Sequence, residues 1–411
     1  MSTPHAGPPL RALDVARALA GTGPASTLVP LVAVLSGDDA EAVRTWRLLL
    51  HGGLAPLAAH VLGEHGQLDA AGPRLRDALR SALEMNAVRN AVLRRAAVTA
   101  SRALGAAGLT PLWAKGIWLA HAVYAQPALR TMSDIDLVVP AGQRAAARRV
   151  LEDLGYAGEH AGPEGGAAAW TDTLRNPATL PGGASYVEID LHDRIRLSAT
   201  REWPVGRLWH HASRSRISGV DVWMPSREAG LLYLAVHLFK HGFDLRHALV
   251  AVADTAALLR ADGGALNIEW LARQLDDARD ATALYMLLAQ LGTRPTPVAQ
   301  DQFERLGRQL DVRGLRTHAD ALLDSAEQLT LSAATDFSLF EIGEQASLAG
   351  ALSGVLAGAR RWRRRVRTPG VVPAPAAAAR WPQLLRRANW RFAYTTFLAG
   401  RLNARLDDDP R

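Results

Sequence analysis

The sequence predicts an α+β protein in which a small α/β core with a mixed sheet is flanked by two all-helical regions. Segments with the alternating, β-branched pattern of strands fall between residues 108 and 225. On either side of them, apolar residues recur at the three- and four-residue spacing of amphipathic helices. We therefore expect a helical N-terminal region at 1–107, the core at 108–225 and a helical C-terminal region at 226–411.

The N-terminal region is expected to be helical because its apolar periodicity runs between clear helix ends. Residues 11–19 and 40–50 carry apolar positions at helical spacing, and the two aspartates before residue 40 suit a helix N-terminus. Residues 74–104 form a longer segment rich in alanine and leucine, which ends at Gly105 and Gly108.

The central region alternates between strand and helix patterns. Helix candidates at 117–124 and 141–154 each follow a short apolar segment. The strand candidates are 110–114, 134–139, 169–174, 186–192 and a hairpin at 216–224 that turns at Gly219. This order of strands and helices is typical of a small α/β unit.

The C-terminal region returns to helical periodicity after Ser226. The helix candidates there are 228–241, 245–261, 268–278 and 281–291. A stretch rich in Gly, Pro and Ala at 369–379 is expected to be a loop, and 380–406 is expected to be a last amphipathic helix.

Composition excludes several classes of protein. The chain has no cysteine, so it has no disulfide, no thiolate nucleophile and no cysteine-based metal site. The net charge of +7 is a mild basic excess, smaller than that of a dedicated nucleic-acid binder. We see no signal peptide, and the longest uncharged run near the C-terminus, 345–359, is shorter than the roughly 20 apolar residues of a membrane span. We therefore expect a cytoplasmic protein without a transmembrane segment.

Asp134 and Asp136 are candidate metal ligands. Two positions apart in a strand, their carboxylates share one face, with Ile135 and Leu137 on the other. The strand is apolar enough to be central, where uncompensated carboxylates are costly, and Mg²⁺ is the expected partner. On an edge strand the same motif would be only a pair of solvated charges, so the neighbouring motifs decide. We also expect Asp136→Asn to relieve repulsion in the metal-free protein.

A second acidic strand candidate follows about fifty residues later. Alternate residues Glu188, Asp190 and His192 share one face of it. If this strand pairs beside the first, Asp190 joins the aspartate pair. Three carboxylates from two adjacent strands can hold two divalent ions for phosphoryl transfer.

The Lys115-Gly116 step is expected to end a strand and open a helix. Glycine allows close backbone approach to a phosphate, and a helix N-terminus supplies N–H donors. Arg130 is spaced to add positive charge beside the aspartates. Only two of the 47 basic residues are lysines, Lys115 and Lys240. This scarcity reflects either codon usage or positions that need a compact ammonium.

These motifs together resemble a known family. The run LWAKGIWLAHAVYAQPALRTMSDIDLVV at 112–139 resembles the signature of uncharacterised bacterial nucleotidyltransferases of the polymerase-β-like superfamily. EIDLH at 188–192 resembles the strand that carries the family's third carboxylate, and 235–259 resembles its helical segment with paired histidines. The resemblance covers roughly 108–291. Where this chain has Lys115-Gly116, the superfamily commonly has Gly-Gly or Gly-Ser.

The resemblance implies a minimal nucleotidyltransferase core. Such an enzyme moves a nucleoside monophosphate from an NTP, with ATP expected, to a hydroxyl of an acceptor and releases pyrophosphate. The acceptor would be a small molecule, a peptide or a protein. The implied ligands of Mg²⁺ or Mn²⁺ are Asp134, Asp136 and Asp190. The expected nucleotide- and cofactor-binding residues are Lys115, Gly116, Arg130, Ser133, His192, Lys240 and His241.

Two readings remain open for the helix predicted at 228–241. His237 and His241 lie one turn apart, with Lys240 adjacent to their face. The helix either brings Lys240 and His241 to the phosphates or acceptor, or packs its histidines against the core. A zinc site is disfavoured because no third ligand is placed by spacing.

Two other functions remain as alternatives. The fold could serve as a non-catalytic nucleotide- or protein-binding module, which the intact carboxylates argue against. An RNA-modifying or toxin-like transferase would rest on the basic patch Arg360–Arg367, which contains Trp362. Nucleic acid is therefore a partner that the sequence allows but does not favour.

Overall fold

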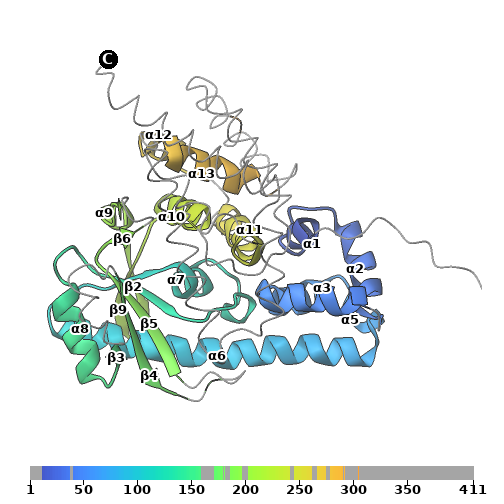
Figure 1. The fold of residues 1–411 in the computed structure, drawn as a ribbon, viewed down its shortest axis with the longest axis horizontal. Helices are drawn as coiled ribbons and strands as arrows, with labels where there is room; N and C mark the ends of the chain where they lie inside the picture. The colour runs from blue at the N-terminus through green and yellow to red at the C-terminus, as the bar shows by residue number, and fades with distance from the viewer. Residues whose placement is uncertain are drawn as a thin grey trace, which may run out of the picture.

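The computed structural model describes residues 12–37, 40–158, 171–178, 180, 186–196, 202–240, 245–261, 266–274, 278–289, 291 and 304. Within these residues the chain has the predicted α+β architecture. A seven-stranded mixed sheet is preceded and followed in the sequence by helices (Figure 1). No described helix combines the length and the apolar character needed to cross a bilayer.

The main sheet has the strand order β3-β4-β5-β2-β1-β9-β8. Its strands are β1 (Leu112–Ala114), β2 (Ile135–Val138), β3 (Ala157–Gly158), β4 (Thr171–Pro177), β5 (Tyr186–His192), β8 (Ser213–Ile217) and β9 (Val220–Met224). β2 runs parallel to β5 and antiparallel to β1, while β1 runs parallel to β9. A separate two-stranded sheet joins β6 (Ile195–Arg196) to β7 (Glu202–Trp203).

The predicted strands are confirmed, with small shifts at their ends. β5 has the predicted bounds, and β8 and β9 form the expected hairpin. Ser218 and Gly219 both adopt positive φ there, at 49° and 79°, as the tight hairpin turn requires. β2 begins at Ile135, so Asp134 lies one residue before the strand instead of inside it.

The N-terminal helices include three that the sequence analysis did not predict, α2, α4 and the short α5. The helices are α1 (Ala12–Leu19), α2 (Leu28–Leu35), α3 (Ala40–His51), α4 (Ala55–Glu64), α5 (Gln67–Ala70) and α6 (Gly72–Ala106). α4 buries residues around most of its circumference, so it lacks the one-sided apolar stripe that reveals a surface helix. The long α6 extends from the strands to α5 along the foot of Figure 1.

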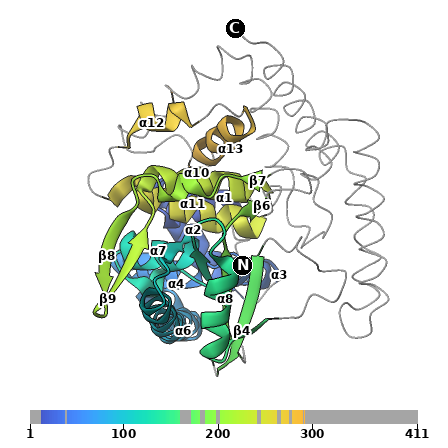
Figure 2. The same cartoon turned by 90° about the vertical axis from the view of Figure 1, so that its left-hand side faces the viewer.

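Further helices come from the middle and the end of the described chain. They are α7 (Lys115–Ala122), η2 (Pro127–Leu129), α8 (Arg144–Asp153), α9 (Gly206–Trp209), α10 (Arg227–Lys240), α11 (Leu245–Arg260), α12 (Ile268–Arg273) and α13 (Ala278–Ala289). Figure 2 shows α10 and α11 between α7 and the α12–α13 pair. The predicted loop at 369–379 and helix at 380–406 lie outside the described residues.

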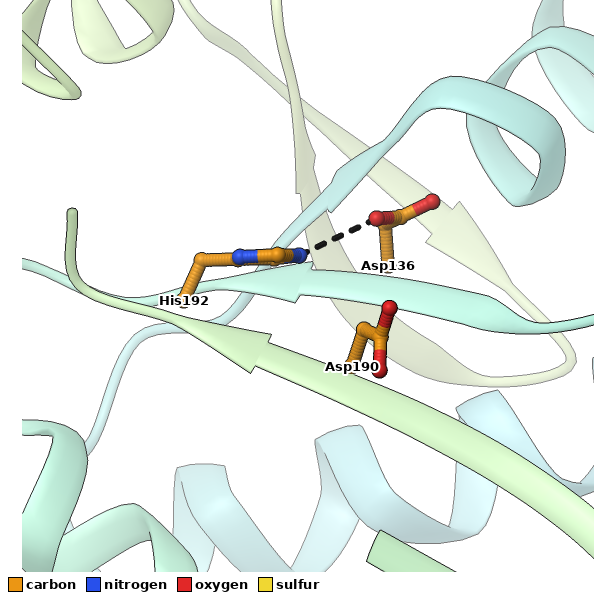
Figure 3. Close-up of side chains that lie close together, drawn as sticks. All are labelled: Asp136, Asp190 and His192. Carbon is orange, nitrogen blue, oxygen red and sulfur yellow. Dashed lines mark hydrogen bonds and ion pairs between the residues drawn. The ribbon is translucent and has the colours of Figure 1, made fainter. Parts of the chain in front are cut away.

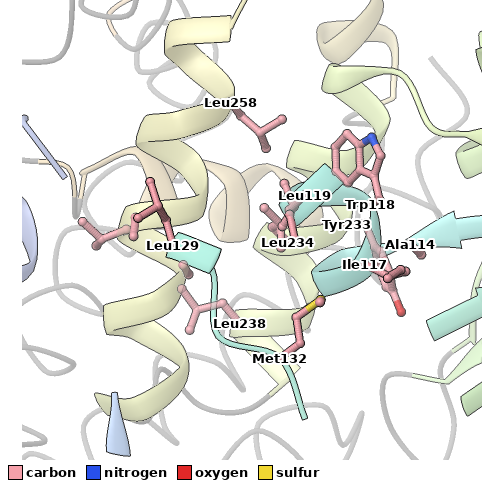
Figure 4. Close-up of a cluster of buried hydrophobic side chains, with 14 of the residues drawn as sticks. Ala114, Ile117, Trp118, Leu119, Leu129, Met132, Tyr233, Leu234, Leu238 and Leu258 are labelled. Atoms are coloured by element: carbon pink, nitrogen blue, oxygen red, sulfur yellow. The ribbon is translucent and has the colours of Figure 1, made fainter. Parts of the chain in front are cut away.

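One apolar core runs through the N-terminal helices, the sheet and the later helices. The sheet strands fall between Leu112 and Met224, but the domain boundaries at 107/108 and 225/226 stay predictions. Figure 4 shows the part of the core where α7 meets α10 and α11. Trp118 of α7 packs on Gly230 of α10 so closely that a Cβ on this glycine would lie 2.1 Å from the indole ring.

Two N-terminal elements hold the segment that leads into β2. Asn86 and Asn90, both buried on α6, donate hydrogen bonds from Nδ2 to the main-chain carbonyls of η2 and Arg130, at 2.6–3.2 Å. The hydroxyl of Thr131 donates to the carbonyl of Gly53, at 2.9 Å. Neutral donors thus tie this segment to both α6 and the turn before α4.

A buried ion pair ties the same segment to α11. The guanidinium of Arg130 donates to both carboxylate oxygens of Asp254, from Nε at 3.1 Å and from Nη2 at 2.9 Å. The hydroxyl of Tyr124 donates to Asp254 as well, at 2.8 Å. Asp254 has no exposed surface, so its charge depends on these donors.

The contact between α7 and α10 predicts opposite results for two glycine substitutions. Gly230→Ala forces a methyl group into the Trp118 ring, and overpacking of this kind costs about 1–3 kcal/mol. Gly105→Ala is the matched control, because this glycine lies exposed in α6 and an added Cβ would meet nothing within 4 Å. Alanine there should stabilise the helix by up to about 1 kcal/mol. Urea unfolding of both variants measures the difference, and equal effects would contradict the packing described.

The ion pair between Arg130 and Asp254 predicts a large loss of stability when the Asp254 side chain is truncated. Asp254→Ala leaves Arg130 buried without its partner, which should lower the free energy of unfolding by about 3–5 kcal/mol. Asp221→Ala is the control, because it removes the exposed pair with Arg214 and should cost less than about 1 kcal/mol. Denaturant midpoints at pH 7 give both values. A small loss for Asp254→Ala would mean that Arg130 finds another partner.

Candidate active site

The register of β2 against β5 brings two carboxylates together. The strands are parallel, and Asp136 lies directly opposite Asp190. Opposed residues in paired strands share one face of the sheet. On the other face, Ile135 and Leu137 pair with fully buried Ile189 and Leu191, which fixes this register because a slip of one residue would bury the carboxylates in the apolar core.

His192 completes a group of three side chains whose donor atoms lie close enough together to hold a metal ion. One ligand atom from each of Asp136, Asp190 and His192 lies within 4.8 Å of the other two. Figure 3 shows the three side chains converging from β2 and β5, with His192 pointing to Asp136. The His192 Nε2 lies 3.1 Å from Oδ1 of Asp136. Of the described residues, these three form the only such group.

Lys115 reaches the group from the neighbouring strand. β1 pairs antiparallel with β2 so that Ala114 lies opposite Asp136, and Lys115 follows as the first residue of α7. Its Nζ donates to Oδ1 of Asp136 at 2.7 Å. The predicted change from strand to helix at Lys115 is therefore confirmed, and it places an ammonium on a site carboxylate.

The ion pair keeps both of its members charged. Burial raises the pKa of the Asp136 carboxyl, but Lys115 and His192 outweigh it and hold the pKa well below its usual range. Burial lowers the pKa of Lys115, but Asp136, Tyr233 and Asp134 raise it above its usual value. The expectation that Asp136→Asn relieves repulsion is therefore wrong for the ion-free protein, because asparagine would leave the ammonium without its counter-charge.

Asp134 lies beside the group rather than in it. Burial and the charges of Asp136 and Asp190 raise its pKa, although Lys115 opposes them. The exposed hydroxyl of Ser133 donates to its Oδ1 at 3.1 Å. Asp134 is thus coupled electrostatically to both group carboxylates, but its role as a metal ligand stays a prediction, as does a nucleotide contact by Ser133.

Two site residues were missed from the sequence. Thr173 on β4 lies opposite Asp190 and donates its hydroxyl to Oδ1 of that aspartate, at 2.7 Å. Tyr233 on α10 is buried, and the centroid of its ring lies 5.6 Å from Nζ of Lys115. Trp203 stacks on Tyr233 with ring centroids 5.6 Å apart. Neither residue belongs to a polar motif, so only strand pairing and helix packing reveal them.

Arg130 and Gly116 have close protein contacts in the structure. The guanidinium of Arg130 is held by Asp254 and is also coupled electrostatically to Asp134, and its predicted role in nucleotide binding stays a prediction. A Cβ at Gly116 would lie 3.0 Å from Nη1 of Arg130 and 3.1 Å from the Met132 side chain. Close packing of Arg130 and Met132 therefore favours glycine at this position, and its predicted contact with a phosphate stays a prediction.

The remaining predicted residues lie at or beyond the limit of the described chain. Lys240 is the last residue of α10, and its side chain is outside the described part. His241 and the patch Arg360–Arg367 also lie outside the described residues. Their predicted contacts with phosphates, acceptor or nucleic acid stay predictions.

The donor set fits a divalent cation. Two carboxylates and an imidazole converge on one side of the sheet, and oxygen and nitrogen donors of this kind bind Mg²⁺, Mn²⁺ and related ions. The hydroxyl of Thr173 orients Asp190, as partners behind metal-binding carboxylates commonly do. The three side chains thus form a possible site for a divalent metal ion.

Comparison with known proteins identifies the family of the chain. A search of curated proteins gave no match. Among solved structures, the chain is similar to an antigenic nucleotidyltransferase-like protein from Paracoccidioides brasiliensis, with 13% identity and a TM-score of 0.29, over 47% of this chain and 91% of that one. The family is shown by a family model instead. This model, described as uncharacterised nucleotidyltransferase, matches residues 38–292. The chain belongs to this uncharacterised nucleotidyltransferase family.

Proposed function

We propose that the protein is a metal-dependent enzyme that transfers a nucleoside monophosphate from an NTP to a hydroxyl of an acceptor and releases pyrophosphate. The observation that carries this proposal is the convergence of Asp136, Asp190 and His192 within 4.8 Å in a chain of this family. ATP is the expected nucleotide. The acceptor is a small molecule, a peptide or a protein.

Mg²⁺ or Mn²⁺ would be held by Asp136, Asp190 and His192, with Asp134 as a further carboxylate beside them. The three-donor group and the raised pKa of Asp134, which arises from burial and from its anionic neighbours, both favour a bound cation. When bound, such an ion stabilises negative charge on the transferring phosphate and on the leaving pyrophosphate.

The chain's own residues then orient the reactants and move one proton. In the proposed reaction the acceptor oxygen forms a bond to the α-phosphorus, and the bond from the α-phosphorus to the pyrophosphate oxygen breaks. Asp190 takes the proton of the attacking hydroxyl. The hydroxyl of Thr173 donates to Oδ1 of Asp190 and leaves the other oxygen for this proton. Lys115 supplies positive charge next to the phosphates.

The alternative functions have less support. A non-catalytic nucleotide- or protein-binding module would not need the convergence of two carboxylates and a histidine at the sheet. An RNA-modifying transferase depends on the patch Arg360–Arg367, which lies outside the described residues.

A label-transfer experiment tests the proposed activity. The protein is incubated with each α-labelled NTP, Mg²⁺ or Mn²⁺ and a cell extract, and the molecule that becomes labelled reveals the acceptor.

Asp190→Asn should abolish transfer without unfolding the protein. The amide oxygen can still accept from Thr173, but the base and one metal-binding charge are lost, so we expect kcat/KM to fall on the order of 10²-fold or more. Asp172→Asn is the control, because Asp172 lies opposite Leu191, on the other face of the same sheet, and pairs with Arg148. Label-transfer kinetics and circular dichroism check both variants. Full activity in Asp190→Asn would remove this residue from the mechanism.

His192→Asn should change the metal preference of the protein. Imidazole nitrogen favours Mn²⁺ and later transition metals over Mg²⁺, whereas carboxylates alone suit Mg²⁺. If His192 is a ligand, the variant should lose Mn²⁺ affinity by about 10–100-fold and Mg²⁺ affinity by much less. Titration calorimetry with each ion gives both affinities. Equal losses for the two ions would show that His192 only orients Asp136.

A further inference from the structure

We propose that Lys115 occupies Asp136 as an internal counter-cation, is displaced when a divalent ion binds, and then contacts the triphosphate. Metal binding and nucleotide binding would thereby be coupled through one side chain. The competition for Asp136 is independent of the proposed function. The second half of the inference, the contact with a triphosphate, rests on that function.

The first observation is that one carboxylate oxygen already has two partners. Oδ1 of Asp136 accepts a hydrogen bond from Nζ of Lys115 at 2.7 Å and lies 3.1 Å from Nε2 of His192. Asp136 is only 3% exposed, so water does little to balance its charge. A divalent ion bound to this carboxylate would lie beside the ammonium, and like charges this close repel strongly in a buried setting. The ammonium and the ion therefore exclude one another.

The second observation is the backbone of Lys115. It adopts φ 43°, in the left-handed region where glycine is free of steric cost and a side chain is not. Strained residues persist where the surrounding structure requires them. Here the strain places the lysine between the end of β1 and the start of α7, directly against Asp136. The long side chain is thus kept at a position where glycine would fit with less strain.

The third observation is a second partner that the ammonium already has. The ring of Tyr233 on α10 lies next to the ammonium, with its centroid 5.6 Å from Nζ. An aromatic face attracts a cation at such a distance, so Tyr233 stabilises the ammonium beside Asp136 and remains its neighbour when the ammonium leaves the carboxylate.

The proposal predicts affinity changes of opposite sign. Removing the ammonium should strengthen binding of free Mn²⁺, because nothing then competes for Asp136. The same change should weaken binding of a triphosphate in the presence of Mn²⁺, because its phosphates lose a partner. Coupling between two ligands is reciprocal and commonly amounts to about 5–150-fold, so we expect changes of at least five-fold in each direction.

The test measures Mn²⁺ binding by electron paramagnetic resonance, with and without the non-transferable analogue α,β-methylene-ATP. Lys115→Met keeps the length of the side chain and removes the charge. Lys115→Gly removes the charge and the backbone strain together, and serves if the methionine variant does not fold. Arg144→Met is the matched control, because it takes a cation from buried Asp193, which is not in the three-residue group. We expect this control to bind free Mn²⁺ as the wild type does.

A measurement on the wild-type chain does not depend on any variant folding. Because the chain has only two lysines, labelling with [ε-¹³C]lysine gives two side-chain signals, and Lys240→Arg identifies them. Mg²⁺ at a concentration that saturates binding by calorimetry should shift the Lys115 signal.

Each result decides one part of the proposal. Unchanged or weaker binding of free Mn²⁺ in the lysine variants, or an unmoved Lys115 signal at saturating Mg²⁺, overturns the competition. Stronger Mn²⁺ binding with unchanged analogue binding overturns the contact with phosphate. If the analogue binds to no form of the protein, the proposed function fails, while the free Mn²⁺ result still stands for Lys115.

Discussion

The parallel register between β2 and β5 is the constraint on which the rest of the site depends. It sets Asp136 opposite Asp190 and directs both away from the buried leucine and isoleucine pairs on the other face. The same register continues across the sheet, so that Thr173 lies beside Asp190 on one flank and Ala114, followed by Lys115, lies beside Asp136 on the other. One row of paired residues across β4, β5, β2 and β1 therefore places a hydroxyl and two carboxylates side by side, and the residue that follows this row in β1 adds an ammonium.

A buried row of carboxylates needs positive charge whether or not a metal ion is present. Lys115 supplies it to Asp136, and together with the hydrogen bond from His192 it holds the pKa of the Asp136 carboxyl below its usual range. This explains how a central strand carries a metal-binding charge in the ion-free protein without a large cost in stability. It also means that the metal-binding carboxylate and the nearest lysine act together, because any change at one alters the charge balance of the other.

The helical regions act as supports that fix the segment before β2. Asn86 and Asn90 on the long α6 hold its carbonyls, the turn before α4 accepts from Thr131, and Asp254 on α11 takes the guanidinium of Arg130. Residues that precede the sheet strands in the sequence and residues that follow them thus meet at one short segment. Large helical layers around a small core are understandable on this basis, since they orient a loop that borders the site.

The sequence by itself determined the α+β class, the strands with their carboxylates and the change from strand to helix at Lys115, because periodicity, β-branching and helix-end residues are local signals. Only the tertiary structure decided which side chains contact one another at the site and around it. Arg130 pairs with Asp254, 124 positions away, and Gly116 leaves room for the Arg130 side chain. Tyr233 and Thr173 enter the site through helix packing and strand register. Contacts between residues so far apart in the chain leave no periodic trace in the sequence, because packing selects them after the local elements have formed.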